Sequence, residues 1–308
     1  VPFNVNYRYG NEELAYLFEN GDAEAVLFET VYADKIDAIR GRLPGVKLWI
    51  AVERAGYPIP HWAVSYADIA PTDNPPTGNG PRSSEDQMFI YTGGTTGMPK
   101  GVVWRHGDVF FALGGGIDQA SGWKATRPED MIEKAKAPGP QVYFATAPLM
   151  HGASQWSVMS RSFVGNKNVL LAKFEPRAVW ELVAQEKVQA LFITGDAMGR
   201  PLAEALDAAG DLDLASLFLV TSTAAVFSPT VKDQFFERFP NLIIVDGVGA
   251  SEVGGNGLLL CTKGKTAMLG GGPTFKPGPG SVVLDERLRV VEAGSDIVGK
   301  LARTGHIP

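Results

Sequence analysis

Residues 88–104 read MFIYTGGTTGMPKGVVW. Two apolar runs, residues 88–91 and 102–104, are rich in β-branched and aromatic residues, which predicts a strand on each side. The loop between them holds glycines, threonines and Lys100. Glycine lets several backbone N–H groups converge on one anion, threonine hydroxyls add donors, and lysine supplies a point charge. The stretch therefore predicts a phosphate-binding loop over residues 91–101; the alternative is a flexible hairpin turn that happens to contain threonine.

The loop is not a Walker loop, because that motif requires serine or threonine directly after the lysine. Here Lys100 is followed by Gly101. The complete string YTGGTTGMPKGV, residues 91–102, resembles instead the phosphate-binding loop of the acyl-adenylate-forming (AMP-binding) superfamily, which includes acyl-CoA synthetases, peptide-synthetase adenylation domains and beetle luciferases. The resemblance implies that the β- and γ-phosphates of ATP are bound by Thr92, Gly93, Gly94, Thr95, Thr96, Gly97 and Lys100.

Apolar runs alternate with helical patterns on both sides of the loop. Upstream, residues 25–29 and 46–52 are predicted strands around a helix at 31–42, which is a βαβ rhythm. Downstream lie five short apolar runs separated by helical patterns: QVYFATA (141–147), NVLLAK (168–173), QALFIT (189–194), LFLVTS (217–222) and LIIVD (242–246). Such strands with helices between them predict an α/β fold of mainly parallel sheets covered by helices.

The segments between these runs differ in how clearly they are patterned. Residues 175–187 predict a helix, with Pro176 in its first turn and Val179 and Val183 on one face. Residues 105–120 predict a helix interrupted by the glycines at 114–116. Residues 70–84 are a polar linker, and residues 121–140 have little periodicity and are expected to form an exposed excursion.

From residue 256 onward the pattern changes to short strands with glycine and proline turns, namely GLLLC, TAMLG, SVVLD, RLRVV and GKLAR. The sequence therefore predicts two regions: an α/β core over residues 1–255 and a small β-rich subdomain over residues 256–308.

Composition excludes several classes of protein. The net charge of −6 without a basic run gives no electrostatic footprint for nucleic acid. No apolar run approaches the ~20 residues that span a bilayer, which leaves only peripheral membrane contact open. A single cysteine, Cys261, excludes an internal disulfide and fits a reducing, cytoplasmic location; it follows an apolar run and is expected to be buried. The oligomeric state is not indicated.

A second motif, DGVGASEVG at residues 246–254, directly follows a predicted strand, and strand ends carrying glycines and an acid are where open α/β sheets bind ligands. The resemblance makes it the adenine- and metal-binding motif, with Glu252 and Thr95 holding Mg²⁺; a helix cap or a solvent-facing glutamate is the alternative. The expected adenine-lining residues are Ala224, Asp246, Gly247, Val248, Gly249, Ala250 and Ser251.

Two residues depart from the family pattern. Val248 stands where relatives usually carry an aromatic residue, and Ala224, in TSTAA (221–225), stands where glycine is common. Neither change removes a charge, so we expect altered nucleotide affinity before lost chemistry.

A third segment, APLMHGASQW at residues 147–156, resembles the one that begins a helix beside the carboxylate substrate, with His151 at the matching position. A plain surface or capping histidine is the alternative. Amino-acid-activating relatives place an aspartate near this point. The absence of any acid here favours an uncharged acyl tail over an amino acid.

The ends of the chain resemble internal positions of longer family members. Residues 1–9 resemble a segment that follows a larger N-terminal region, and GKLARTGHIP (299–308) resembles the last turn of the large domain. The resemblance therefore implies a fragment, with a ribose-binding aspartate motif and a C-terminal domain expected beyond it.

The resemblance covers essentially all 308 residues and is strongest to bacterial fatty-acyl-CoA synthetases. It implies a ligase that uses ATP, Mg²⁺ and coenzyme A to convert a small carboxylic acid, expected to be a fatty or other apolar acid, into an acyl-adenylate and then a thioester. Lys100, His151 and Glu252 are the expected catalytic residues. Two alternatives remain: an acyl-AMP ligase that delivers to a carrier protein, and a nucleotide-binding relative without catalysis. Acyl length and branching are not indicated.

Overall fold

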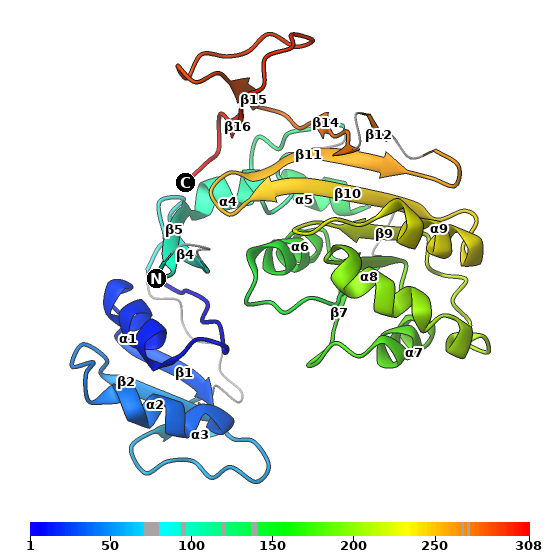
Figure 1. The fold of residues 1–308 in the computed structure, drawn as a ribbon. Coiled ribbons are helices and arrows are strands. Elements are labelled where there is room, and N and C mark those ends of the chain that lie inside the picture. Colours follow the sequence, from blue (N-terminus) through cyan, green and yellow to red (C-terminus); the bar gives the residue numbers. More distant parts are fainter. Residues whose placement is uncertain (71–79, 94–96, 119–120, 137–140, 266–267, 270–271) are drawn as a thin grey trace. The chain divides into compact units, whose positions relative to one another are not determined.

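The structure, a computed structural model, describes residues 1–70, 80–93, 97–118, 121–136, 141–265, 268–269 and 272–308. The chain divides into two compact units, Val1–Val103 and Trp104–Pro308 (Figure 1). Each unit has its own core and is described by itself.

The first unit contains a three-stranded parallel sheet in the order β1-β2-β3. The chain begins with α1 (Asn11–Asn20) and β1 (Ala25–Glu29). A 3-10 turn (Thr30–Tyr32) and α2 (Ala33–Arg40) then lead to β2 (Leu48–Val52). The last elements of the sheet region are β3 (Val64–Ser65) and α3 (Tyr66–Ile69). Fully buried Leu17 of α1 and Ile39 of α2 pack in one cluster with the sheet. The predicted βαβ rhythm is confirmed, with a helix shorter than the expected 31–42.

The two strands expected around the glycine-rich loop are present. β4 (Gln87–Thr92) and β5 (Lys100–Arg105) pair in a two-stranded sheet. Residues 94–96 at the centre of the loop lie outside the described residues. The loop is therefore anchored at both ends by paired backbone, with Thr92 ending one strand and Lys100 beginning the other.

The second unit is built on a seven-stranded sheet in the order β14-β11-β10-β9-β8-β6-β7. β6 (Val142–Ala145), β7 (Lys167–Leu170), β8 (Ala190–Ile193), β9 (Leu219–Ser222) and β10 (Ile243–Ala250) are mutually parallel. β11 (Gly254–Cys261) and β14 (Lys276–Pro277) extend the sheet in antiparallel fashion. All five predicted parallel strands are confirmed.

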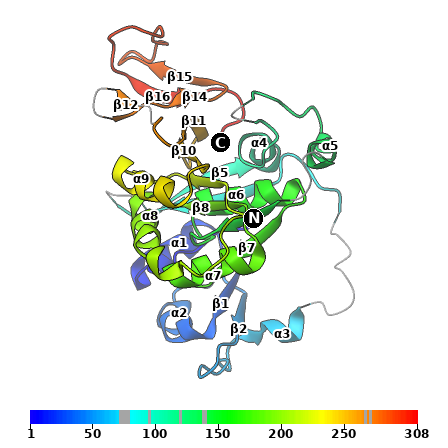
Figure 2. The same cartoon turned by 90° about the vertical axis from the view of Figure 1, so that its right-hand side faces the viewer.

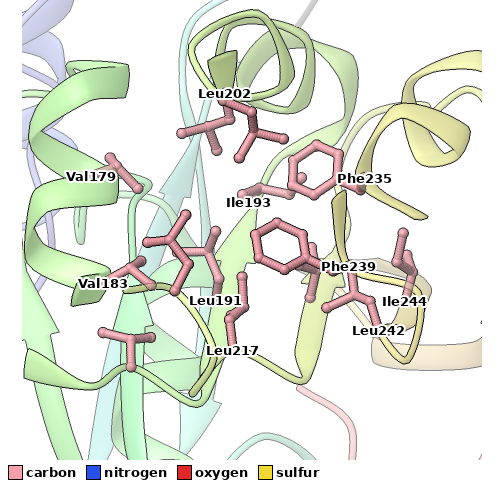
Figure 3. Close-up of a cluster of buried hydrophobic side chains, with 14 of the residues drawn as sticks. Val179, Val183, Leu191, Ile193, Leu202, Leu217, Phe235, Phe239, Leu242 and Ile244 are labelled. Atoms are coloured by element: carbon pink, nitrogen blue, oxygen red, sulfur yellow. The ribbon is translucent and has the colours of Figure 1, made fainter. Parts of the chain in front are cut away.

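Three helices cover one face of this sheet: α7 (Pro176–Glu186), α8 (Gly195–Glu204) and α9 (Pro229–Arg238). Figure 3 shows their apolar side chains pointing toward the strands, with Val179 and Val183 from α7, Leu202 from α8, Phe235 from α9, and Leu191 and Ile193 from β8. Burying each such side chain contributes about 1.5–3 kcal/mol, so packing on this face stabilises the unit.

Local sequence explains why α7 begins and ends where it does. The Glu175 carboxylate accepts a hydrogen bond from the Ala178 backbone N–H at 2.7 Å, and Pro176 occupies the first turn, where its missing N–H is not needed. Lys187 then adopts a left-handed conformation, φ 53°, and ends the helix. The helix predicted over 175–187 is confirmed within one residue at each end.

The opposite face of the sheet is covered by α6 (Gly152–Phe163), whose Val158 packs against a separate cluster that includes Tyr143 and Phe192. All four residues of β8 are buried, as expected for a strand covered on both faces. Figures 1 and 2 show α8 and α9 on one side of β10 and β11, and α4 (His106–Ala112) and α5 (Asp130–Lys136) on the other.

Two segments match the expectation only in part. The helix expected over 105–120 is interrupted at the glycines, as predicted, but it ends at Ala112 and does not resume in the described residues that follow, 113–118. The chain turns tightly there: a Cβ added at Gly114 or Gly116 would lie 2.9 Å from the Phe110 carbonyl oxygen. The described residues 121–136 are mostly exposed, as expected, but they also contain α5 and bury Ala125 and Met131.

The C-terminal part contains the expected short strands, with two differences. β12 (Met268–Leu269) pairs with β13 (Gly272–Pro273), and β15 (Ser281–Leu284) pairs with β16 (Lys300–Arg303). GLLLC, however, lies within β11 of the large sheet, and RLRVV makes only an isolated bridge from Val290 to Leu284. The division at residue 255 stays a prediction.

No helix in the described part of the chain combines the length and apolar character needed to cross a bilayer.

Candidate functional site

The motif DGVGASEVG forms a hairpin at the end of the large sheet. Residues 246–250 end β10, residues 251–253 make the turn, and Gly254 begins β11 with φ 71°. A Cβ added at Gly249 would lie 2.3 Å from the Gly254 carbonyl oxygen. Glycine is therefore required at 249, because the two strands approach each other too closely for any side chain there.

Glu252 occupies the turn and is exposed. Within the described residues, its carboxylate makes no hydrogen bond or ion pair. A carboxylate held at a turn without a protein partner is a hard oxygen ligand, which fits Mg²⁺. The second expected ligand, Thr95, lies outside the described residues with Gly94 and Thr96.

The motif TSTAA lies beside the hairpin. Ser222, the last residue of β9, pairs with Asp246 of β10. One residue further on, the Thr223 hydroxyl donates to the Gly247 carbonyl oxygen at 2.9 Å. The two segments expected to contact adenine are thus hydrogen-bonded neighbours at the carboxyl edge of the parallel strands, which is where open α/β sheets bind ligands.

Ala224 has φ 67°, in the left-handed region that residues with a Cβ rarely adopt. This conformation costs an L-residue about 1–2 kcal/mol, whereas glycine adopts it freely. Alanine at position 224, where glycine is common in the family pattern, therefore places strain on the backbone close to Gly247.

Ala224→Gly is expected to raise the free energy of unfolding by about 0.5–1 kcal/mol, because the relieved strain exceeds the ~0.4–1 kcal/mol of added unfolded-state entropy. Urea denaturation of the full-length protein measures this. Ala225→Gly is the matched control: Ala225 is exposed and its φ is not positive, so glycine there is expected to destabilise. Loss of stability in both variants would contradict the assignment of strain to Ala224.

Asp246 points into the core rather than toward solvent. It is 7% exposed, and its Oδ2 accepts a hydrogen bond from the Nζ of Lys232 on α9, which is 2% exposed. Burial raises the pKa of Asp246, and the ammonium of Lys232 opposes that rise. The second oxygen, Oδ1, is buried without a hydrogen-bond partner among the described residues. A direct role of Asp246 at adenine stays a prediction.

Sequence reasoning missed Lys232. It lies next to Val231 and shares a helix face with Phe235 and Phe236, all of them buried. A lysine in an otherwise apolar stripe was the available signal that a buried partner existed. Cys261 is fully buried, as expected, with its Sγ 3.7 Å from the Lys232 Nζ.

His151 is the residue that precedes the first turn of α6, and it is exposed. Its backbone N–H donates to the Pro148 carbonyl oxygen at 3.1 Å. Because α6 follows β6, His151 lies beyond the carboxyl end of a strand of the same sheet that carries the hairpin and TSTAA. The second unit therefore gathers three of the sequence motifs at one edge.

The phosphate-loop residues belong to the first unit. Gly93 and Lys100 are exposed, and the Lys100 ammonium has no hydrogen bond or ion pair within the residues that the structure describes. A site that joins this loop to the three motifs of the second unit stays a prediction.

A family model and curated proteins both match this chain over essentially its whole length. The family described as "AMP-binding enzyme" matches residues 1–306. The chain is 40% identical over 317 residues to "3-oxocholest-4-en-26-oate--CoA ligase" of Rhodococcus rhodochrous, covering all of this chain and 56% of that protein. It is 39% identical over 320 residues to "Medium/long-chain-fatty-acid--CoA/3-oxocholest-4-en-26-oate--CoA ligase" of Mycolicibacterium smegmatis, covering all of this chain and 57% of that protein. The chain thus spans about half the length of these curated relatives.

Solved structures share the fold at lower identity. A long-chain-fatty-acid-CoA ligase (FadD1) from Archaeoglobus fulgidus has a TM-score of 0.74 and 18% identity, over 99% of this chain and 58% of that one. The anthranilate CoA ligase AuaEII, in complex with anthranoyl-AMP, has a TM-score of 0.71 and 22% identity, over 96% of this chain and 54% of that one.

Proposed function

The chain belongs to the AMP-binding enzyme family, and we propose that the protein containing it activates a carboxylic acid with ATP and transfers the acyl group to coenzyme A. The observation that supports this best is the hydrogen-bonded pairing of TSTAA with the DGVGASEVG hairpin, which leaves Glu252 exposed at the carboxyl edge of the sheet.

The proposed reaction has two steps. A carboxylate oxygen of the acid attacks the α-phosphorus of ATP, the bond to pyrophosphate breaks, and an acyl-adenylate forms. The thiol of coenzyme A then attacks the acyl carbon, and AMP leaves as the thiol proton is lost to solvent. Neither step forms a covalent bond to the protein, so binding, orientation and charge neutralisation provide the catalysis.

Different residues of this chain are proposed to bind the phosphates, the metal ion, the adenine and the acyl group. The loop from Thr92 to Gly97, with Lys100, binds the β- and γ-phosphates. Glu252 and Thr95 are the ligands for Mg²⁺, which supplies charge neutralisation at the phosphates when bound. Asp246–Ser251 and Ala224 line the adenine site, and His151 borders the acyl group.

The acyl group is proposed to be apolar. The segment at residues 147–156 carries no acid that would recognise an amino group. The names of the relatives include medium- and long-chain fatty acids and a steroid carboxylate, which supports a bulky hydrocarbon tail. We also propose a cytoplasmic location, because the cofactors are cytoplasmic metabolites and the single cysteine forms no disulfide.

The full-length protein tests this function. AMP release is measured over a panel of fatty, steroid and amino acids, with and without coenzyme A. Acyl-CoA formation with an apolar acid supports the proposal. ATP-dependent formation of the acyl-adenylate without a thioester would identify an acyl-AMP ligase instead, and absence of pyrophosphate exchange with every acid would indicate a nucleotide-binding protein without catalysis.

Lys100→Ala is expected to weaken ATP binding about 10–100-fold, because a charge-assisted contact to phosphate contributes about 1.5–3 kcal/mol. Calorimetric titration of the full-length protein with ATP measures the change. Lys263→Ala, which removes an exposed lysine from the turn after β11, is the control and is expected to bind normally. Unchanged affinity in Lys100→Ala would remove this lysine from the phosphate site.

A further inference from the structure

The turn that carries Glu252 is held from both sides by side chains that lie far away in the sequence. On the N-terminal side, the Trp104 Nε1–H donates to the Ser251 carbonyl oxygen at 2.9 Å. On the C-terminal side, the Arg303 Nη1 donates to the carbonyl oxygens of Val253 at 3.2 Å and Gly255 at 2.6 Å. The exposed carboxylate therefore projects from backbone that is fixed immediately before and immediately after it.

Trp104 is a rigid donor. It is 0% exposed, and its ring packs edge-to-face on Trp156 of α6, with ring centroids 6.2 Å apart. A fully buried indole cannot change rotamer without opening a cavity, so the direction of its N–H is set by packing. The Ser251 carbonyl oxygen is thereby tied to the core of the second unit rather than to solvent.

Arg303 is an unusual buried cation. It is 6% exposed, and within the described residues it has no carboxylate partner, its hydrogen bonds going to backbone carbonyl oxygens instead. Burial lowers the pKa of its guanidinium. Placing a charge in the interior is unfavourable unless polar groups surround it, so an arginine here indicates that holding these two carbonyls matters.

Gly254 lies between the two carbonyl groups, those of Val253 and Gly255, that accept hydrogen bonds from Arg303. Gly254 has φ 71°, and a Cβ added there would lie 2.9 Å from Leu113 Cδ2 and 3.3 Å from Arg303 Nη1. Only glycine permits both the left-handed backbone and the close approach of the guanidinium. The turn, the arginine and the glycine are therefore mutually adapted.

We propose that Trp104 and Arg303 are positioning residues for Glu252: together they orient its carboxylate so that it meets the metal ion on bound ATP. The inference rests on the proposed function for the identity of that metal. Groups that orient a metal ligand through its backbone or side chain typically change metal affinity 10–100-fold when removed.

The test measures metal-dependent nucleotide binding rather than turnover. In the full-length protein, the dissociation constant of ATP is measured by calorimetry with and without Mg²⁺, and the ratio of the two gives the gain in affinity that the metal provides. Trp104→Phe keeps the aromatic packing and removes the N–H donor, and Arg303→Lys keeps the charge but cannot reach both carbonyls. Each is expected to reduce the gain about tenfold.

Trp180→Phe is the matched control. Trp180 is also 0% exposed, and its Nε1–H donates to the Leu202 carbonyl oxygen at 2.9 Å, in the core beneath α7 and α8. It removes the same type of hydrogen bond away from the Glu252 turn, and the metal-dependent gain is expected to stay unchanged. Equal losses in Trp104→Phe and Trp180→Phe would overturn the proposal, because general loosening of the unit would then explain both.

A double-mutant cycle separates failure of this inference from failure of the proposed function. Trp104→Phe is expected to have no further effect on the gain when Glu252→Gln is already present. If Glu252→Gln reduces the gain while Trp104→Phe and Arg303→Lys do not, the positioning role is wrong and the metal assignment stands. If Glu252→Gln itself leaves the gain unchanged, Glu252 is not a metal ligand. The metal assignment and the positioning role are then both wrong. Thermal unfolding of every variant shows which are folded. If only one of Trp104→Phe and Arg303→Lys is folded, that variant is sufficient to test the inference.

Discussion

Glu252→Gln in the full-length protein is expected to fold normally and to form acyl-adenylate at least about a hundredfold more slowly at a fixed Mg²⁺ concentration. Glutamine has nearly the shape of glutamate, and Glu252 is exposed without a protein partner among the described residues, so stability changes little. The lost negative charge removes a ligand from a cation whose charge neutralisation contributes several kcal/mol, and each 1.36 kcal/mol corresponds to a factor of about ten in rate.

The measurement is pyrophosphate exchange as a function of Mg²⁺ concentration. Glu286→Gln is the control, because Glu286 is also an exposed glutamate, in the segment between β15 and β16. It is expected to retain the normal rate and the normal Mg²⁺ dependence. A normal rate with normal Mg²⁺ dependence in Glu252→Gln would show that the metal is bound elsewhere.

Lys232→Met is expected to lower the free energy of unfolding by about 3–5 kcal/mol, because it leaves the buried Asp246 carboxylate without its counterion. The methionine fills much of the space of the lysine stem, so the loss comes from the uncompensated charge rather than from a cavity. The double variant Lys232→Met/Asp246→Leu removes both charges and is expected to recover most of this stability, since apolar replacements of buried pairs are often neutral.

The pH dependence of the single variant gives an independent check. Burial raises the pKa of Asp246 and the Lys232 ammonium lowers it, so removing the lysine leaves only the upward influence. A carboxyl that binds its proton more tightly in the folded state contributes stability below its ordinary pKa of about 3.9, and that contribution is lost as the pH rises through the raised folded value. The deficit of Lys232→Met relative to wild type is therefore expected to be smallest in acid and to widen toward neutral pH.

Urea denaturation of the full-length protein from acidic to neutral pH measures this deficit. Lys187→Met is the control, because Lys187 pairs with Asp213 at 2.7 Å on the exposed surface, where such pairs contribute about 0–1 kcal/mol. The same deficit at every pH, or an equal loss in the surface variant, would show that the buried pair does not stabilise the folded state in the expected way.

The main elements of the fold could be predicted because their signals are local. Each of the five parallel strands is a short run of apolar residues that must be covered on both faces, and each is followed by a pattern with helical period or by a turn. The start of α7 follows from Glu175 and Pro176, two neighbouring residues that satisfy the first turn. Residues 105–140 were harder to predict, since their helices are short and their buried residues, such as Ala125 and Met131, are isolated in a polar stretch.

The sequence by itself determined the family, the parallel sheet and the three motifs around Ala224, Glu252 and His151, because each is encoded by residues adjacent in the chain. Only the tertiary structure decided which distant side chains bind the residues of the motif around Glu252. Trp104 is 147 residues from Ser251, Arg303 is 48 residues from Gly255, and Lys232 is 14 residues from Asp246. Such contacts arise when packed helices and strands bring distant side chains together, and neither propensity nor motif records which buried donor meets which carbonyl.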